Sequence, residues 1–106
     1  MLEIYQKRID TILKQYEKPY WDPLSQLARL AEEVGEVGRI LNHRFGDKPK
    51  KPTEAPDDLE EELADVLYTV ICLANSQNIN LDKALERAIH KMEVRDRDRF
   101  TKKSDA

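Results

Sequence analysis

The sequence has few residues that break helices and almost none that could cross-link a small fold. Its 106 residues include three glycines, five prolines and one cysteine. The single cysteine, Cys72, excludes an intrachain disulfide, and the charged segment 1–10 lacks the apolar run of a secretory signal, so we expect a cytoplasmic protein. The most apolar stretch, 66–74, is far shorter than the roughly 18 residues of a membrane span. We therefore expect a soluble chain with no membrane partner.

Charge is abundant in this chain but almost balanced. Charged residues make up 37% of the sequence, and the net charge is -3 at pH 7. Nucleic-acid-binding domains usually carry a basic patch or stripe, so this balance argues against a nucleic-acid partner. The length is that of one domain spanning 1–106, and domains of this size often gain stability by associating with copies of themselves.

Apolar residues recur at helical spacing, and with so little glycine this predicts an all-α fold of four helices. The expected helices span residues 2–16, 23–45, 58–77 and 80–98. Pro23 after Asp22 is typical of the first helical position, and Asn80 is a candidate N-cap. The segment 46–57, rich in proline and lysine, is predicted to be a surface loop, and the tail 101–106 is predicted to fray.

Two matched pairs of carboxylates form the most informative pattern. Glu33 and Glu36 lie three residues apart on the second predicted helix, and Glu62 and Asp65 have the same spacing on the third. Residues at this spacing share a helix face, so antiparallel packing of the two helices would bring all four acids together. Segment 66–74 of the third helix is apolar on nearly all sides, which is typical of a buried helix. Clustered carboxylates beside such a helix need a counter-charge.

A divalent cation would supply that charge. Carboxylate oxygens without histidine or cysteine suit a hard cation, so the pattern predicts a site for Mg²⁺, with Mn²⁺ as the alternative. The competing interpretation is that the acids are ordinary solvated residues, some paired with Arg29 or Arg39. A ferritin-like di-iron site is disfavoured, because it needs histidine where Arg39 and Asp65 stand here. Glu32 points away from Glu33 and could support the site or lie on the surface.

Four further side chains are candidates for contacts with a phosphate-bearing ligand. Lys91 and Arg95 lie one turn apart on the fourth predicted helix and suit phosphate oxygens, although pairing with Glu86 or with the helix dipole is an equal alternative. Asn75 could orient a ligand or serve a local role near a helix end. Trp21 could stack on a nucleobase, but core packing is the favoured interpretation.

The histidines and the cysteine predict no chemistry of their own. His43 and His90 have no partners at metal-ligand spacing, so surface positions are expected for both. Cys72 is most simply a small buried apolar residue.

A longer motif gives these observations a family context. Glu32-Glu33-Val34-Gly35-Glu36, followed by Glu62-Leu63-Ala64-Asp65, resembles the EExxE and ExxD signature of MazG-like all-α nucleoside triphosphate pyrophosphohydrolases. Segments 23–30, 42–46 with the Lys-Pro-Lys-Lys loop that follows, and 95–100 resemble the small, single-domain YpjD-type branch of that family. The resemblance covers nearly the whole chain.

The resemblance implies a four-helix bundle that assembles as a homodimer or homotetramer and hydrolyses nucleotides with the help of Mg²⁺. The expected reaction cleaves ribo- or deoxyribonucleoside triphosphates between the α and β phosphates, and it would remove unwanted nucleotides from the pool. The implied catalytic acids are Glu32, Glu33, Glu36, Glu62 and Asp65, of which the last four would bind the metal, while Lys91, Arg95 and Asn75 would contact the substrate and Trp21 stays a candidate. The alternatives are a nucleotide sensor that does not cleave, a metal-stabilised oligomerisation module, and an adaptor for a different protein.

Overall fold

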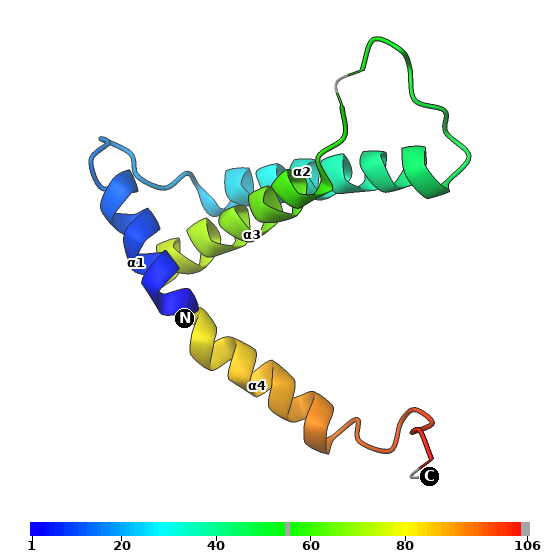
Figure 1. Cartoon of the computed structure of the whole chain (residues 1–106). Coiled ribbons are helices and arrows are strands. Elements are labelled where there is room, and N and C mark those ends of the chain that lie inside the picture. Colours follow the sequence, from blue (N-terminus) through cyan, green and yellow to red (C-terminus); the bar gives the residue numbers. More distant parts are fainter. Residues whose placement is uncertain (55, 105–106) are drawn as a thin grey trace.

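The computed structural model describes residues 1–54 and 56–104, and every regular element within these ranges is a helix. The helices are α1 (Leu2–Leu13), α2 (Pro23–Phe45), α3 (Leu59–Ser76) and α4 (Leu81–Val94) (Figure 1). The predicted all-α, four-helix fold is confirmed. Residue 55 of the predicted loop and residues 105–106 of the predicted frayed tail lie outside the described residues. None of the four helices is long and apolar enough to cross a membrane.

Short local signals set the beginnings of the helices. Pro23 occupies the first turn of α2, where its missing N–H costs no helical hydrogen bond. At the start of α3, the Asp58 carboxylate accepts a hydrogen bond from the backbone N–H of Glu61 at 2.9 Å. The Asn80 side chain accepts one from the backbone N–H of Lys83 at 3.1 Å, as predicted for the start of α4. Each bond satisfies an amide that has no partner within the helix.

Two helices end several residues earlier than predicted, and α3 (Leu59–Ser76) differs from its predicted range by one residue at each end. α1 ends at Leu13 rather than at residue 16, and a turn in which Tyr16 donates to the carbonyl of Leu13 follows it. Pro19 disfavours the helical conformation only at Lys18, which sets an outer limit for the helix, and residues 14–18 form turns and bends before it. α4 ends at Val94 rather than at residue 98, and 95–99 form turns. The alternating charges of that segment offer no apolar stripe that would hold a helix against a neighbour.

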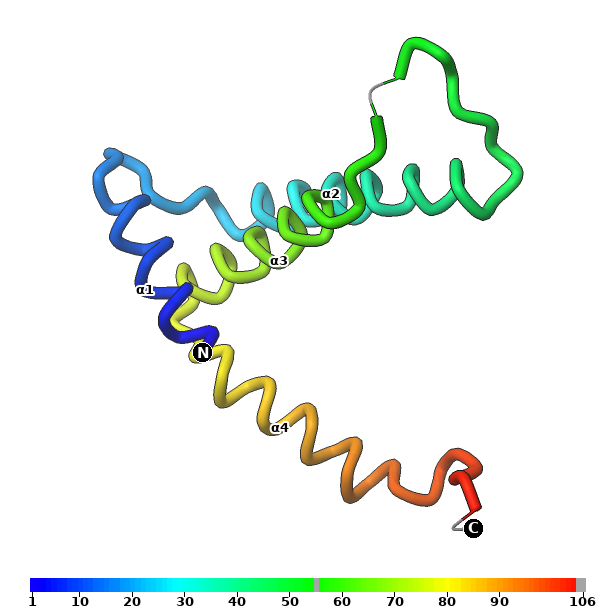
Figure 2. The backbone as a smooth tube through the Cα atoms, in the orientation of Figure 1, coloured from blue at the N-terminus to red at the C-terminus, as the bar shows by residue number. Residues whose placement is uncertain are grey.

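The chain is open rather than compact. α2 and α3 pack side by side and antiparallel, whereas α1 crosses the end of α3 and α4 extends away from the pair (Figures 1 and 2). The segment that joins α2 to α3 loops out at one end of this pair (Figure 2). The radius of gyration is 18.1 Å, whereas a compact domain of this length has a value of about 13 Å.

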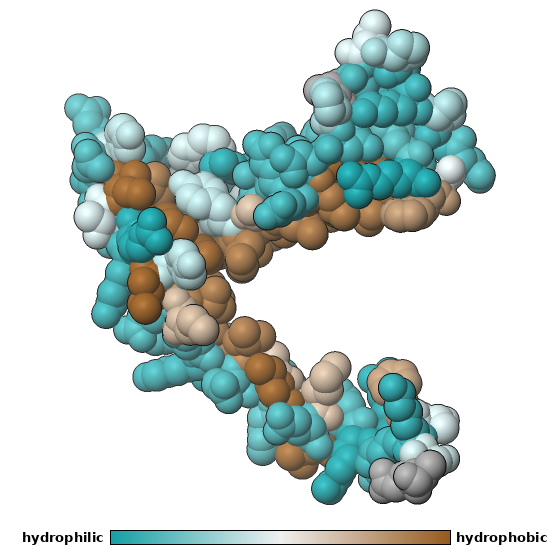
Figure 3. All heavy atoms as spheres, viewed as in Figure 1, coloured by the Kyte–Doolittle hydropathy of each residue, from teal (hydrophilic) through white to brown (hydrophobic). Residues whose placement is uncertain are grey.

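Because of this shape, a single chain buries little of its apolar surface. Among residues 1–54 and 56–104, the buried apolar residues are Ile40, Ile71, Cys72 and Ala74, which confirms the interpretation of the cysteine. Large apolar side chains stay exposed on all four helices, among them Ile4 and Ile12 on α1 and Leu27, Val34, Leu41, Leu63, Leu67, Leu85, Ile89 and Met92 on the other three. Figure 3 shows hydrophobic residues along the side of the α2–α3 pair that faces the open angle, and along α4. Exposed apolar surface of this extent is typical of a protein interface.

The first turns of α1 and α4 are joined by polar contacts. The backbone N–H groups of Leu2 and Glu3 donate to the Asp82 carboxylate at 2.9 and 3.1 Å. The side-chain oxygen of the buried Gln6 accepts a hydrogen bond at 3.0 Å from the backbone N–H of Leu81. Each helix therefore supplies a side chain that caps the beginning of the other.

This junction predicts an acid-sensitive stability. Hydrogen bonds from the N-terminal ammonium and from the backbone N–H groups of Glu3 and Leu2 lower the pKa of Asp82. A lowered folded-state pKa stabilises the fold above the ordinary Asp pKa of about 3.9, and the gain is lost as the pH falls through the folded value. We expect Asp82→Asn to have a lower melting temperature than wild type at pH 7. This difference in melting temperature should disappear below about pH 4. Thermal unfolding followed by circular dichroism measures the difference.

The exposed Asp98 provides the control for this experiment, because Asp98→Asn removes the same charge away from the junction. A gap between wild type and Asp82→Asn that stays constant from pH 3 to pH 8 would show that ionisation of Asp82 does not matter.

Candidate active site

Three of the four predicted acids meet between α2 and α3. Carboxylate oxygens of Glu33, Glu62 and Asp65 all lie within 4.8 Å of one another, and all three residues are half-buried. Glu33 comes from the middle of α2, and the other two come from the first turns of α3. The antiparallel packing of the two helices therefore brings the acids together as the spacing predicted.

The cluster is electrostatically strained without a counter-ion. Partial burial, followed by the charges of Asp65, Glu36, Glu33 and Glu61, raises the pKa of Glu62. A group whose charge is disfavoured in this way gains most from a nearby cation. Three carboxylates in one place, with oxygen as their only ligand atom, fit Mg²⁺ or Mn²⁺ better than a soft metal. The residues present therefore suit a hard divalent cation.

Glu36, the fourth acid, is engaged elsewhere. Its Oε2 accepts hydrogen bonds from Nη2 and Nε of Arg39 at 2.8 and 3.2 Å. The charge of Glu36 nevertheless contributes to the raised pKa of Glu62, so the two carboxylates are close enough to interact. The neighbouring Glu32 is exposed on α2. The structure thus places Glu36 beside the three-acid cluster and in a different ion pair.

A pocket of about 270 Å³ lies next to the acids and is lined in part by aromatic side chains. Its lining includes Trp21, Gln26, Arg29, Tyr68, Thr69 and Cys72. The Trp21 side chain is 52% exposed, so the favoured prediction that it packs in the core is wrong. Thr69 lies one helical turn after Asp65 on α3, and its hydroxyl donates at 2.8 Å to the Asp65 backbone carbonyl.

Arg29 stands between the pocket and the cluster. Its guanidinium carbon lies 5.4 Å from the Trp21 ring centroid and 5.6 Å from that of Tyr68, both within the range of cation–π contacts. Its Nε is 4.0 Å from a carboxylate oxygen of Glu33. The sequence pointed to Arg29 only as a surface ion-pair partner. Its spacing of four residues from Glu33 was visible, but the two rings that hold it come from separate segments.

Gln26 is a second side chain whose position the sequence did not predict. It is buried, its Nε2 donates to the backbone carbonyl of Trp21 at 2.8 Å, and its Oε1 accepts from the Ser76 hydroxyl at 3.3 Å. These bonds tie the segment that carries Trp21 to α2 and α3. The pocket wall is therefore held by buried polar contacts.

Asn75 serves the local role that was one of its two predicted alternatives. Its Nδ2 donates to the Gln6 carbonyl at 3.0 Å and to the Tyr20 hydroxyl at 3.1 Å, and its Oδ1 accepts from Gln6. Burial and the hydrogen bond to Asp10 raise the pKa of Tyr20 to about 12, so its hydroxyl remains protonated at neutral pH. This network links α1 to α3 and lines a separate, open groove of about 570 Å³.

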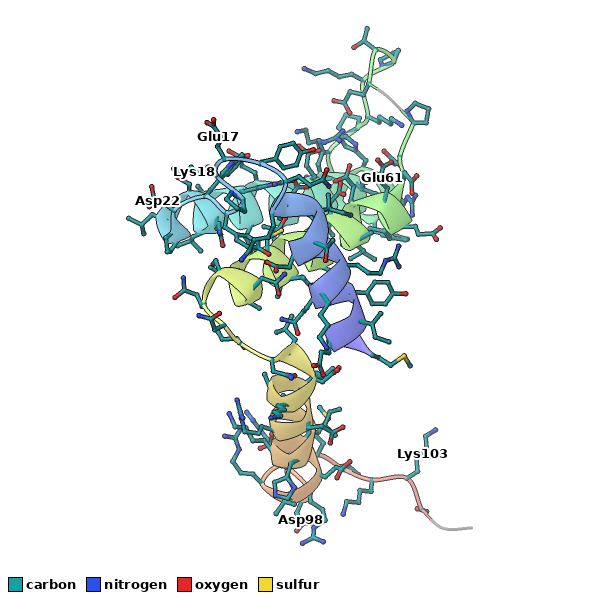
Figure 4. All side chains as sticks on the ribbon, turned by 90° about the vertical axis from the view of Figure 1, so that its left-hand side faces the viewer. Glu17, Lys18, Asp22, Glu61, Asp98 and Lys103 are labelled. Atoms are coloured by element: carbon teal, nitrogen blue, oxygen red, sulfur yellow. The ribbon has the colours of Figure 1, made fainter. Side chains whose placement is uncertain are left out.

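The two predicted cations of α4 do not reach the acids within one chain. Lys91 and Arg95 lie at the exposed end of the helix that extends away from α2 and α3 (Figure 1). Arg95 donates instead to the neighbouring Asp96 carboxylate at 3.2 and 3.4 Å. Figure 4 shows Glu61, near the start of α3, in the upper part of the molecule and Asp98, beyond α4, in the lower part.

The prediction of a surface position for His43 is wrong. Its side chain is 1% exposed, and its Nε2 lies 3.4 Å from a carboxylate oxygen of Glu54. The loop after α2 covers the histidine, whereas the exposed position predicted for His90 is confirmed.

Comparison with known proteins assigns the class. The family model of the MazG nucleotide pyrophosphohydrolase domain matches residues 22–100, a range that contains all five predicted acids. The chain therefore belongs to the MazG nucleotide pyrophosphohydrolase family and is a hydrolase that acts on the phosphate bonds of nucleotides.

Among individual proteins, the chain is similar to YpjD of Bacillus subtilis (strain 168). The two are 47% identical over 100 residues, which are 94% of this chain and 90% of YpjD. The crystal structure of YpjD from Bacillus subtilis matches with a TM-score of 0.76 at 45% identity, covering 86% of this chain and 93% of that one. The crystal structure of the Bacillus-conserved MazG protein, described as a nucleotide pyrophosphohydrolase, matches with a TM-score of 0.74 at 35% identity, covering 100% and 96%.

Proposed function

We propose that this chain is a Mg²⁺-dependent nucleoside triphosphate pyrophosphohydrolase, with Mn²⁺ as the alternative metal. The reaction cleaves ribo- or deoxyribonucleoside triphosphates between the α and β phosphates and releases a monophosphate and pyrophosphate. In the cell this would remove unwanted nucleotides. One observation carries the proposal, which is the meeting of Glu33, Glu62 and Asp65 within 4.8 Å beside an aromatic-lined pocket.

The acids have different roles in the proposed reaction. Glu33, Glu62 and Asp65 would hold the cation, and Glu36 would join them after leaving Arg39. A bound divalent cation neutralises phosphate charge and lowers the pKa of a water molecule. A carboxylate that is free of the cation, with Glu32 as a candidate, accepts the proton of the attacking water or orients it. Arg29 lies at the mouth of the pocket, where its charge favours the phosphate chain of the substrate.

The pocket suits the nucleobase. Trp21 and Tyr68 offer ring faces, and Thr69 and Gln26 offer polar groups beside them. A base in this position would leave its phosphate chain beside the acid cluster, because Thr69 and Asp65 are one helical turn apart on α3. Flat, half-exposed rings bind bases by stacking without a requirement for one particular base.

Removal of the tryptophan ring tests this placement. Stacking of one base on an aromatic ring contributes about 1 to 3 kcal/mol, so Trp21→Ala should raise KM roughly fivefold to a hundredfold, whereas Trp21→Phe should raise it less. Trp21 is the only tryptophan, so nucleotide binding should also change the fluorescence of the wild-type protein. An unchanged KM for Trp21→Ala, with no fluorescence change on binding, would place the base elsewhere.

We also propose that the enzyme is a homodimer or homotetramer. The exposed apolar faces of α2, α3 and α4 support this assembly, because another copy would cover them. Lys91 and Arg95 would then contact the triphosphate in the site of a neighbouring copy. Asn75 would act on the substrate indirectly, through the network that positions Tyr20 and the segment before α2.

Product analysis tests the reaction itself. The purified protein is incubated with a panel of normal and modified nucleoside triphosphates, with Mg²⁺, with Mn²⁺ and with chelator, and the products are separated. Metal-dependent release of monophosphate and pyrophosphate is the expected result. Diphosphate with orthophosphate would mean that a different bond is cleaved. Tight binding without any product would favour the sensor, and neither binding nor turnover would favour the oligomerisation module.

A further inference from the structure

Arg39 contacts two acids that belong to different parts of the chain. On one side, its Nη2 and Nε donate to Oε2 of Glu36, a member of the acidic signature on α2. On the other side, its Nη1 lies 3.7 Å from Oε2 of Glu54, which belongs to the loop between α2 and α3. The guanidinium therefore already has a second carboxylate partner within reach.

The second partner is held in position. The Glu54 side chain is mostly buried, and its Oε2 also lies 3.4 Å from Nε2 of the buried His43. Two separate elements, α2 and the loop, thus converge on one carboxylate. Such a fixed acceptor can take over an arginine without rearrangement of the loop.

While Glu36 is paired with Arg39, its Oε2 is engaged and only Oε1 is free for the acid cluster. Both N–H groups of the arginine point at the same carboxylate oxygen. Glu36 lies outside the three-acid cluster, but its charge contributes to the raised pKa of Glu62, so the two carboxylates interact. The Glu36–Arg39 pair is partly exposed, and exposed ion pairs are weak, so a divalent cation can compete with the arginine for Glu36.

We propose that Arg39 is a positioning residue that holds Glu36 away from the acid cluster until a divalent cation binds there, and that it then transfers to Glu54. This inference rests on the proposed function, because it requires that the cluster binds a metal. It adds an exchange of partners that couples metal binding to the loop at the end of α2.

The first test measures Mn²⁺ binding to the nucleotide-free protein by calorimetry. Arg39→Gln removes the competitor, so we expect Mn²⁺ to bind about two- to fivefold more tightly, the range that corresponds to one exposed ion pair. Arg44→Gln is the matched control. Arg44 lies on the same helix with similar exposure, 40% against 36%, but its carboxylate partner is Asp57. If both variants change the affinity for Mn²⁺ equally, the loss of a positive charge alone explains the change, and the proposal is overturned.

The second test removes the acceptor. Glu54→Gln should weaken Mn²⁺ binding, because Arg39 then has no second carboxylate to which it can move. Asp57 lies in the same loop and pairs with Arg44 and Lys50 rather than with Arg39. The Asp57→Asn variant therefore controls for the loss of a negative charge. In the Arg39→Gln background, Glu54→Gln should have no further effect beyond that of Asp57→Asn. An effect of Glu54→Gln that persists without Arg39 would overturn the transfer.

These outcomes separate the inference from the proposed function. A wild-type protein that binds no Mn²⁺ and cleaves no nucleotide would overturn both. A wild-type protein that binds Mn²⁺ and cleaves nucleotides, with additive effects of Arg39→Gln and Glu54→Gln, would overturn the role of Arg39 alone.

Discussion

Glu62→Gln should abolish most hydrolysis and at the same time stabilise the metal-free protein. The substitution removes a cation ligand from the centre of the acid cluster, and loss of one strong electrostatic contact in an active site costs roughly 10² to 10³ in kcat. In chelator the effect on stability has the opposite sign, because neighbouring charges and partial burial raise the pKa of Glu62. A raised pKa means that the ionised carboxylate destabilises the fold at neutral pH, so neutral Gln removes that cost.

Melting temperatures in chelator and in saturating Mg²⁺ test both signs. The metal stabilises the form that binds it, so wild type should gain stability on addition of Mg²⁺ and Glu62→Gln should gain little. In chelator, Glu62→Gln is therefore expected to have the higher melting temperature. In saturating Mg²⁺, wild type is expected to have the higher one.

The neighbouring Glu61 provides the control. Glu61 is exposed, lies next to Glu62 on α3 and is one of the charges that raise its pKa, but it is not part of the three-acid cluster. Glu61→Gln therefore removes the same charge from the same region without removing a ligand. It should retain hydrolysis within a few-fold of wild type. If Glu62→Gln is as active as Glu61→Gln, the acid cluster is not the catalytic centre.

The meeting of Glu33, Glu62 and Asp65 could be predicted because it depends on two local facts. The i, i+3 spacing places each pair on one helix face, and consecutive helices usually pack as neighbours. The capped starts of α3 and α4 were predictable for the same reason, since a cap depends on residues close in sequence.

Other features depend on contacts that local patterns do not encode. The i, i+3 spacing of Glu36 and Arg39 was visible, but the loop residue Glu54, which gives Arg39 a second partner, comes from a segment without periodicity. The same loop buries His43. Gln26 ties the segment that carries the half-exposed Trp21 to α2 and α3, and these contacts depend on the packing of α2 against α3.

The apolar periodicity predicts the helices, but a periodic stripe does not say whether the same chain or another copy covers it. Leu63 and Leu67 lie one turn apart on α3, and both are about half exposed in the single chain. The same is true of the apolar side chains Leu85 and Ile89 on α4. A sequence that specifies an interface between copies therefore has the same pattern as one that specifies a larger core.

Leu67→Glu tests whether a second copy covers this surface. Leu67 is 48% exposed in the single chain, and complete burial of a leucine is worth about 2 kcal/mol. If copies of the chain pack on α3, the substitution removes this gain and places a charge in an apolar interface. We expect wild type to elute as a dimer or tetramer and Leu67→Glu to elute as a smaller species. A loss of about 2 kcal/mol corresponds to a melting temperature lower by roughly 10 °C.

Two further measurements make this result specific to an interface. Gln15→Glu adds the same charge at an exposed position after α1 and should change neither elution nor stability. The melting temperature of an oligomer rises with protein concentration, whereas that of a monomer does not. Wild type should therefore show this dependence, and Leu67→Glu should lose it. A Leu67→Glu variant with wild-type elution and melting temperature would mean that this face of α3 stays in water, and the open shape of the single chain would then be its functional form.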